Sequence, residues 1–352
     1  MIVNNQKKLE LFKKYFNKKN CLCVDTEFER KKTYYSKLSI ITISDGQKIF
    51  IFDLLKFPDQ IKTIREIFKS KKKVKIIHGG MQDIEIFLNH NINIEPFFDT
   101  QIASGFLGLD KNISYANLVK KYFKKVLDKK HQNEDWLRRP LLNSQIRYLE
   151  RDVKYLKKIY LIQSKLLKKE KKLNFAKEEF SLIFKKIKNN NGINSKFKKK
   201  LGIQLYNNKN FINLIKIRDD LSKKKNLPKN WILKDEEIIT IIKNKSFHTI
   251  KKNKTFSQNQ IKDITNLLKK LSKIKVKKEN NEIQVKSLEF FRFLVSKKYS
   301  IDQNLIASKF DIAEYKSIKK NSKWRNKIFY DLYEKIITGK KKFLIKDFKP
   351  FH

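Results

Sequence analysis

A short apolar strand that ends in two acidic residues constrains this chain more than any other stretch. The segment Cys21–Phe28 reads Cys-Leu-Cys-Val-Asp-Thr-Glu-Phe. In an extended strand, residues at i and i+2 point to the same face, so Asp25 and Glu27 project together. They leave the strand at its carboxyl end, where open α/β sheets bind their ligands. Two interpretations follow: the pair holds a divalent metal ion, or each acid pairs with a basic residue of Arg30–Lys32.

The charge of the chain predicts a polyanionic partner. Its 352 residues carry 83 Lys and Arg against 36 Asp and Glu, a formal net charge of +47. Nucleic acid is the partner that such an excess favours. The chain is also rich in Lys, Ile and Asn with only eight Gly and five Pro, as adenine- and thymine-rich coding would produce. Length and a 40% hydrophobic content predict two or three domains with real cores.

The cysteines and the amino-terminal residues predict a cytoplasmic protein. Cys21 and Cys23 alternate along one strand, where a disulfide would be strained, so we expect buried free thiols in a reducing compartment. Two cysteines do not make a zinc site. Residues 1–14 do not resemble a signal peptide, and no apolar run approaches the roughly 18 residues that span a membrane.

The order of elements predicts an α/β domain with a mixed sheet flanked by helices. Alternating and apolar runs predict strands over 21–28, 38–44, 48–53 and 74–77, with an Asp45-Gly46 hairpin turn between the second and third. Helical spacing predicts helices over 7–17, 58–69, 81–88, 99–107 and 114–125. Asp99 is the expected N-cap of the fourth helix.

Three further residues could complete a site with the strand acids. Asp83 lies in the first turn of a helix, where an acid is common because it complements the helix dipole. A longer helix is predicted after Asn143-Ser144, with a buried face that extends to Tyr160. Tyr148 and Asp152 lie one turn apart on a neighbouring stripe of that helix, so they point the same way.

Together, Asp25, Glu27, Asp83 and Asp152, with Tyr148 four residues before the last acid, resemble the DEDDy exonucleases. Within them the chain is similar to the ribonuclease D family over residues 20–165. The further matching motifs are Tyr34-Tyr35 with Leu38, His78-Gly79-Gly80, Asp99-Thr100-Gln101, Leu127-Asp128-Lys129, Asp135-Trp136-Leu137 and Arg139-Pro140. Arg147 occupies the place where a His-type member would need its imidazole, and we expect His131 to be exposed in a polar loop.

The resemblance implies a ribonuclease-H-like fold that holds two divalent ions, Mg²⁺ or Mn²⁺, through the four carboxylates. It implies that Asp25 bridges both ions, that Glu27 and Asp152 complete one site, and that Asp83 supports the other through water. Tyr148 would hydrogen-bond the attacking water, and its usual pKa near about 10 favours orientation over base catalysis. The expected substrate contacts are Tyr34, Tyr35, His78, Trp136, Arg138 and Arg139. Packing is an equal alternative for Trp136.

The second half of the chain resembles helical HRDC domains. We expect an exonuclease domain over 1–188, a linker over 189–200, an HRDC domain over 201–280 and a second HRDC-like domain over 281–352. The first HRDC match departs from the family pattern because Ile217 stands where a Trp usually precedes the Arg. A generic helical bundle that rigidifies the enzyme is the alternative.

The leading hypothesis from the resemblance is a 3′→5′ exoribonuclease that trims tRNA precursors with 3′ extensions and releases nucleoside 5′-monophosphates. No membrane association and no obligate protein partner are expected. A 3′→5′ DNA exonuclease is an alternative, because the acids do not report the sugar of the substrate. A nucleic-acid-binding protein without catalysis is the third.

Overall fold

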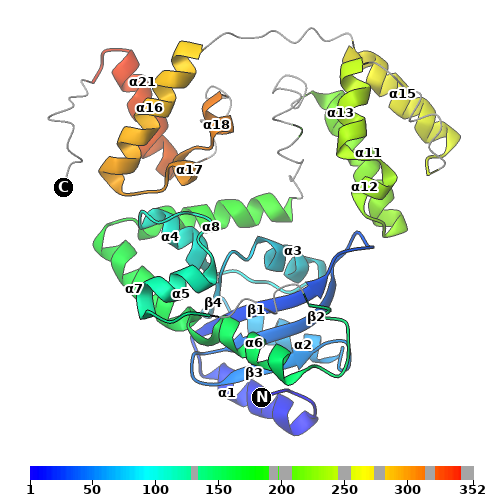
Figure 1. Ribbon diagram of the computed structural model, residues 1–352, viewed down its shortest axis with the longest axis vertical. Coiled ribbons are helices and arrows are strands. Elements are labelled where there is room, and N and C mark those ends of the chain that lie inside the picture. The colour runs from blue at the N-terminus through cyan, green and yellow to red at the C-terminus, as the bar shows by residue number, and fades with distance from the viewer. Residues whose placement is uncertain are drawn as a thin grey trace. The chain divides into compact units, whose positions relative to one another are not determined.

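The computed structural model (Figure 1) describes residues 1–127, 134–189, 197, 208–244, 255–272, 282–313 and 322–341. Two compact units share these residues. The first comprises residues 1–29, 38–189 and the described part of 282–352, and the second comprises 30–37 and the described part of 190–281. Asp128, Lys129, His131 and most of the predicted linker 189–200 lie outside the described residues.

A mixed sheet forms the centre of the first unit, as the sequence predicts, and it has five strands. Its order is β3-β2-β1-β4-β5. The parallel strands are β1 (Cys21–Glu29), β4 (Val74–Ile77) and β5 (Phe97–Asp99), and β2 (Lys37–Ser44) pairs antiparallel with β3 (Ile49–Asp53). The sequence did not predict β5, because three residues are too few to show a strand period.

Eight helices accompany the sheet in the described residues up to 189 (Figure 1). They are α1 (Gln6–Asn17), α2 (Gln60–Phe68), α3 (Met81–Asn89), α4 (Thr100–Phe106), α5 (Tyr115–Phe123), α6 (Asn143–Lys154), α7 (Leu156–Lys169) and α8 (Leu173–Lys188). The predicted N-cap is confirmed, since the Asp99 side chain accepts hydrogen bonds from the backbone N–H groups of Gln101 and Ile102.

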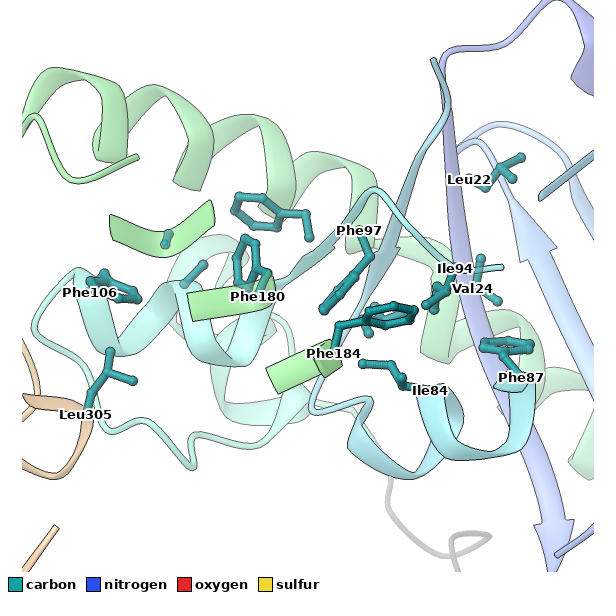
Figure 2. Close-up of a cluster of buried hydrophobic side chains, with 14 of the residues drawn as sticks. Leu22, Val24, Ile84, Phe87, Ile94, Phe97, Phe106, Phe180, Phe184 and Leu305 are labelled. Atoms are coloured by element: carbon teal, nitrogen blue, oxygen red, sulfur yellow. The ribbon is translucent and has the colours of Figure 1, made fainter. Parts of the chain in front are cut away.

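Aromatic packing fastens α8 to the edge of the sheet (Figure 2). Phe97 of β5 lies with its ring centroid 5.6 Å from that of Phe180 and 6.4 Å from that of Phe184. Leu22 and Val24 of β1 belong to the same buried cluster. The strand that carries the acids is therefore held rigidly by this buried cluster. Its Cys23 is a buried free thiol.

The carboxyl-terminal helices pack into the core of the first unit. They are α16 (Glu282–Tyr299), α17 (Gln303–Ile306), α18 (Lys309–Ala313), α20 (Lys323–Arg325), the π-helical turn η1 (Asn326–Tyr330) and α21 (Asp331–Ile337). Glu179 of α8 accepts hydrogen bonds from Trp324 Nε1 at 3.0 Å and from both terminal nitrogens of Arg325 at 2.6 and 2.8 Å. We therefore correct the expectation of a separate domain over 281–352, because these helices share one hydrophobic cluster with the sheet.

The second unit is helical and includes a loop from the first half of the chain. Its helices are α11 (Lys209–Lys225), α12 (Lys229–Ile232), α13 (Asp235–Asn244) and α15 (Gln258–Ser272). Residues 30–37, which the sequence placed in the exonuclease domain, group with these helices. The reason is a set of polar contacts that Tyr34 and Tyr35 make to α11 and its end. No helix in the described parts of the chain is long and apolar enough to cross a membrane.

Candidate active site

Three carboxylates from two elements meet at the carboxyl end of β1. Asp25 and Glu27 come from the strand and Asp152 from α6, and one oxygen of each lies within 4.8 Å of the others. All three side chains are partly buried. Oxygen donors in this arrangement fit a hard divalent cation such as Mg²⁺ or Mn²⁺. The i, i+2 spacing on a strand therefore produces the convergence that the sequence predicts.

Asp83 reaches the same region from the start of α3. Thr26, which lies between the two strand acids, donates its hydroxyl to the Asp83 carboxylate. The charge of Asp83 raises the pKa of both Asp25 and Glu27, so it lies within electrostatic range of them. Asp83 is not one of the three carboxylates that converge within 4.8 Å.

A glycine turn places Asp83. The backbone N–H groups of Gly79 and Gly80 each donate to the Asp99 carboxylate at 3.0 Å. Gly79 has a φ of +62°, which favours glycine, and a Cβ on Gly80 would lie 2.5 Å from Ile77 Cδ1. One carboxylate thus fixes the turn that starts α3 while it caps α4, so Asp99 has a structural role.

Burial and mutual repulsion make the acids hard to ionise when no cation is bound. Burial, and then the charge of Asp152, raises the pKa of Glu27 to about 9. The same two causes, followed by the charges of Glu27 and Asp83, hold the pKa of Asp25 well above its usual range. Burial raises the pKa of Asp83 and of Asp152 to about 6. A bound cation would relieve this repulsion, which is a second reason why the site fits a metal.

Tyr148 lies beside Asp152, one helical turn away. Burial, followed by the charges of Asp152 and Glu27, raises the pKa of Tyr148. The phenol therefore stays protonated at neutral pH, and its hydrogen bond with Asp152 offsets part of the rise that burial causes in the pKa of that carboxyl. The indole ring of Trp136 packs 5.7 Å from the ring of Tyr148 and fixes its orientation.

The helix that carries Tyr148 and Asp152 is shorter than the sequence predicts. The apolar pattern predicts one helix through Tyr160, but α6 ends at Lys154 and α7 starts at Leu156. The cause is the hydroxyl of Tyr115, which donates to Arg151 O at 3.1 Å and accepts from Tyr155 N at 3.0 Å. It bridges the two groups that would otherwise close a helical turn, a recognised cause of helix breaks.

A cavity of about 350 Å³ opens beside the acids. Asp25, Tyr148 and Asp152 form one side of it. The lining also includes Gly79 and the polar side chains of Gln101, Asn112, Ser114 and Tyr115. The cavity offers both ionic and hydrogen-bonding groups to a ligand that binds next to the carboxylates.

Three predicted substrate contacts have other roles in the structure. Both ring nitrogens of His78 are engaged, Nδ1 with Thr100 Oγ1 at 2.9 Å and Nε2 with Ile113 O at 3.0 Å. Trp136 is 4% exposed and packs in a core cluster, so the packing alternative holds. Arg139 pairs with Asp53 at 2.6 and 2.8 Å. Their polar or aromatic groups are engaged within the protein, and His78 also lines the cavity beside the acids, so a contact of these residues with substrate stays a prediction.

The remaining predicted contacts differ in accessibility. Arg138 is exposed, as a phosphate contact requires. Tyr35 is 42% exposed, whereas Tyr34 is 7% exposed and donates its hydroxyl to Asp219 at 3.0 Å. We therefore correct the prediction for Tyr34, whose hydroxyl anchors the loop 30–37 to α11.

Sequence reasoning missed Tyr115 and Gln101. Gln101 was noted only as part of a motif, although its Nε2 donates to Ile113 O at 3.1 Å beside the cavity. Tyr115 gave no signal, because nothing in its spacing indicates that its hydroxyl enters another helix.

Known proteins resemble this chain, most of all in its first half. Residues 1–169 match the family described as 3′-5′ exonuclease. A ribonuclease D of Shewanella sp. (strain ANA-3) is 32% identical over 178 residues, which cover 50% of this chain and 46% of that one. A ribonuclease D of Bartonella henselae is 27% identical over 354 residues, which cover 93% of this chain and 87% of that one. The chain thus spans about half of the first relative and most of the second.

A solved structure shares the fold along the whole chain. Escherichia coli RNase D, described as an exoribonuclease involved in structured RNA processing, matches with a TM-score of 0.74 and 20% identity. The match covers 97% of this chain and 99% of that chain. The mixed sheet and the helical second half therefore both have counterparts in one known fold.

Proposed function

We propose that this chain is a ribonuclease D-type 3′→5′ exonuclease, which hydrolyses RNA from the 3′ end and releases nucleoside 5′-monophosphates, because residues 1–169 match a 3′-5′ exonuclease family and its relatives include ribonuclease D proteins. The convergence of Asp25, Glu27 and Asp152 within 4.8 Å carries the proposal. We further propose tRNA precursors with 3′ extensions as the substrate.

The four carboxylates would hold two divalent ions, Mg²⁺ or Mn²⁺. Asp25, Glu27 and Asp152, which converge, would supply the ligands at the centre of the site, and Asp83 would support it from the start of α3. Bound ions would activate water and neutralise charge on the scissile phosphodiester. The hydrogen bond from Thr26 keeps the Asp83 carboxylate in place.

Tyr148 would orient the attacking water. Its raised pKa keeps the hydroxyl protonated, so it cannot act as the base at neutral pH. The hydroxyl is already positioned by Asp152 and by the packing of Trp136. Arg138 and Tyr35, whose side chains are exposed, are the proposed contacts to the RNA outside the cavity.

A matched assay on RNA and DNA tests this function. The purified full chain is incubated with Mg²⁺ or Mn²⁺ and with 5′-labelled hairpins of one sequence that end in a single-stranded 3′ tail. We expect stepwise shortening of the RNA, which EDTA abolishes, and nucleoside 5′-monophosphates as products. Asp25→Asn should lower the rate about a thousandfold, and Asp59→Asn, an exposed acid on the surface, should not change it.

The outcomes separate the three hypotheses. Equal or faster shortening of the DNA hairpin would favour a DNA exonuclease. Tight RNA binding without any shortening, with either ion, would favour a binding protein without catalysis. Shortening that persists in EDTA or in Asp25→Asn would contradict a metal site at these carboxylates.

A further inference from the structure

The chain contains one helical motif twice, once in each unit. The segments α11–α12–α13 and α16–α17–α18 align without a gap when Arg218 is paired with Arg292. In both copies a long helix ends in a left-handed residue, Asn226 with φ +49° and Ser300 with φ +46°. A one-turn helix follows in each copy. The two copies can therefore be compared position by position.

In the first copy, the buried arginine has an acidic partner. Arg218 is 3% exposed, and its Nη1 donates to Leu233 O at 2.9 Å and to Asp235 Oδ1 at 2.6 Å. The carboxylate neutralises the guanidinium, as a buried charge requires.

In the second copy, the arginine remains but the acid is replaced. Arg292 is 6% exposed, and its Nη1 donates to Ala307 O at 2.8 Å, the counterpart of Leu233 O. The position of Asp235 is occupied by Lys309. Arg292 pairs with no acid among the described residues, and this missing acid is the difference between the copies, because the buried Nε of both Arg218 and Arg292 has no hydrogen-bond partner. The second copy thus places two cations where the first has an ion pair.

Both cations line one cavity of about 540 Å³ at the surface of the first unit. Its other lining side chains include Lys297, Gln303 and Asn304, which can donate hydrogen bonds, and Ser296, whose hydroxyl donates to Ile301 O at 2.6 Å. One acid, Asp302, also lines the cavity. Its carboxylate is engaged by the backbone N–H groups of Asn304, Leu305 and Lys111 at 2.7, 3.2 and 3.4 Å. It therefore caps α17, and the cavity keeps an excess of positive charge.

We propose that this cavity binds a phosphate of the RNA backbone, which supplies the negative charge that Asp235 supplies in the first copy. The choice of RNA rests on the proposed function. A guanidinium with nearby ammonium groups and hydrogen-bond donors matches phosphate oxygens. A phosphodiester of a long polyanion is favoured over a small anion, because the whole chain carries a net charge of +47.

Restoring the acid of the first copy tests the proposal. RNA affinity of the full chain is measured in EDTA, which prevents hydrolysis and makes the result independent of catalysis. Lys309→Asp should weaken binding about tenfold and reduce the slope of log Kd against log salt by about one. Its melting temperature should equal or exceed that of the parent, because Arg292 regains a carboxylate. Lys340→Asp, an exposed residue outside the cavity, is the matched charge control and should weaken binding less than about twofold.

Three other outcomes would decide between the proposal and its alternatives. Equal weakening by Lys309→Asp and Lys340→Asp would overturn the proposal in favour of a diffuse charge effect. If inorganic phosphate raises the melting temperature of the parent only, while RNA affinity is the same in both Asp variants, the cavity binds free phosphate and the proposal fails. If Lys309→Asp does not fold, Lys309→Gln decides: weaker RNA binding at an unchanged melting temperature supports the proposal, and unchanged binding overturns it.

Discussion

The hydroxyl of Tyr115 lies inside the backbone ladder of another helix, where it accepts the N–H of Tyr155 at 3.0 Å. The same hydroxyl donates to Arg151 O at 3.1 Å. Asp152 belongs to the turn that this bridge interrupts. The position of Asp152, a proposed metal ligand, therefore depends on the phenol of Tyr115. Among the described residues, this phenol forms no hydrogen bond with Asp25 or Glu27.

Removing this bridge should lower activity without removing any proposed ligand. In Tyr115→Phe, the two backbone groups lose their partner or close the turn, and Asp152 shifts. We expect kcat to fall about tenfold with KM within about twofold, and the metal concentration for half-maximal rate to rise. The free energy of unfolding measured in urea should fall by about 1–3 kcal/mol. Tyr160→Phe, whose ring packs on Phe98, is the control, and identical behaviour of both variants would contradict a positioning role.

Without metal, the protein should become less stable as pH rises. The pKa of Glu27 is raised from 4.5 to about 9, and the pKa values of Asp83 and Asp152 are raised from 3.8 to about 6. Groups with a higher pKa in the folded chain bind more protons when folded, so the free energy of unfolding decreases as pH rises through this window. In EDTA the melting temperature should fall between about pH 5 and 9. Glu27→Gln should flatten that profile above pH 6, and a profile identical to the parent would contradict the assignment.

Two neighbouring arginines should respond differently to the same change. Arg139 forms two hydrogen bonds to Asp53 and donates to Ser39 Oγ at 2.8 Å, so Arg139→Met leaves the buried Asp53 carboxylate without its counter-charge. We expect it to lower the free energy of unfolding by about 3 kcal/mol. Arg138 is exposed, so Arg138→Met should change stability by less than about 0.5 kcal/mol and weaken RNA binding instead. Equal losses of stability would contradict these roles.

The docking of the carboxyl-terminal helices should depend on one of two adjacent glutamates. Glu179 pairs with Arg325 through both terminal nitrogens, so Glu179→Gln removes the counter-charge of that guanidinium. We expect a loss of about 3 kcal/mol in urea unfolding. Glu178 accepts from the backbone N–H of Lys323 at 2.6 Å, a bond that glutamine keeps. Glu178→Gln should therefore cost less than about 1 kcal/mol, and the reverse order would be inconsistent with this docking.

Local spacing explains which parts of the site were predictable. Asp25 and Glu27 share a strand face, and Tyr148 and Asp152 share a helix face, so periodicity alone orients each pair. Asp83 follows a glycine turn, and its place follows from the order of elements. In the structure, Asp25, Glu27 and Asp152 converge, and the charge of Asp83 acts on the strand acids, while the catalytic roles of these residues stay predictions.

What the sequence could not show depends on contacts between distant segments. Whether an aromatic or basic side chain is free or engaged is decided by its neighbours, so the sequence does not show that His78 bonds to Thr100 or that Arg139 pairs with Asp53. The repeat that pairs Arg218 with Arg292 is visible in the sequence, but its meaning appears only when Asp235 is seen bonded to Arg218. The spacing of residues in the sequence predicts which face of a helix or strand a side chain lies on, whereas tertiary packing decides which partner it contacts.

Because of the loop that follows β1, the exonuclease half of the chain is not expected to be exchangeable on its own between homologues. Tyr34 donates to Asp219, and the Tyr35 N–H donates to Asn226 Oδ1 at 3.3 Å, both in the helical second half. A polypeptide that stopped near Asn189 would keep every acid of the site but lose these partners, as well as those of Glu179. Exchange of the helical half between homologues must therefore transfer residues 30–37 with it, so the two halves are expected to be inherited as a matched pair.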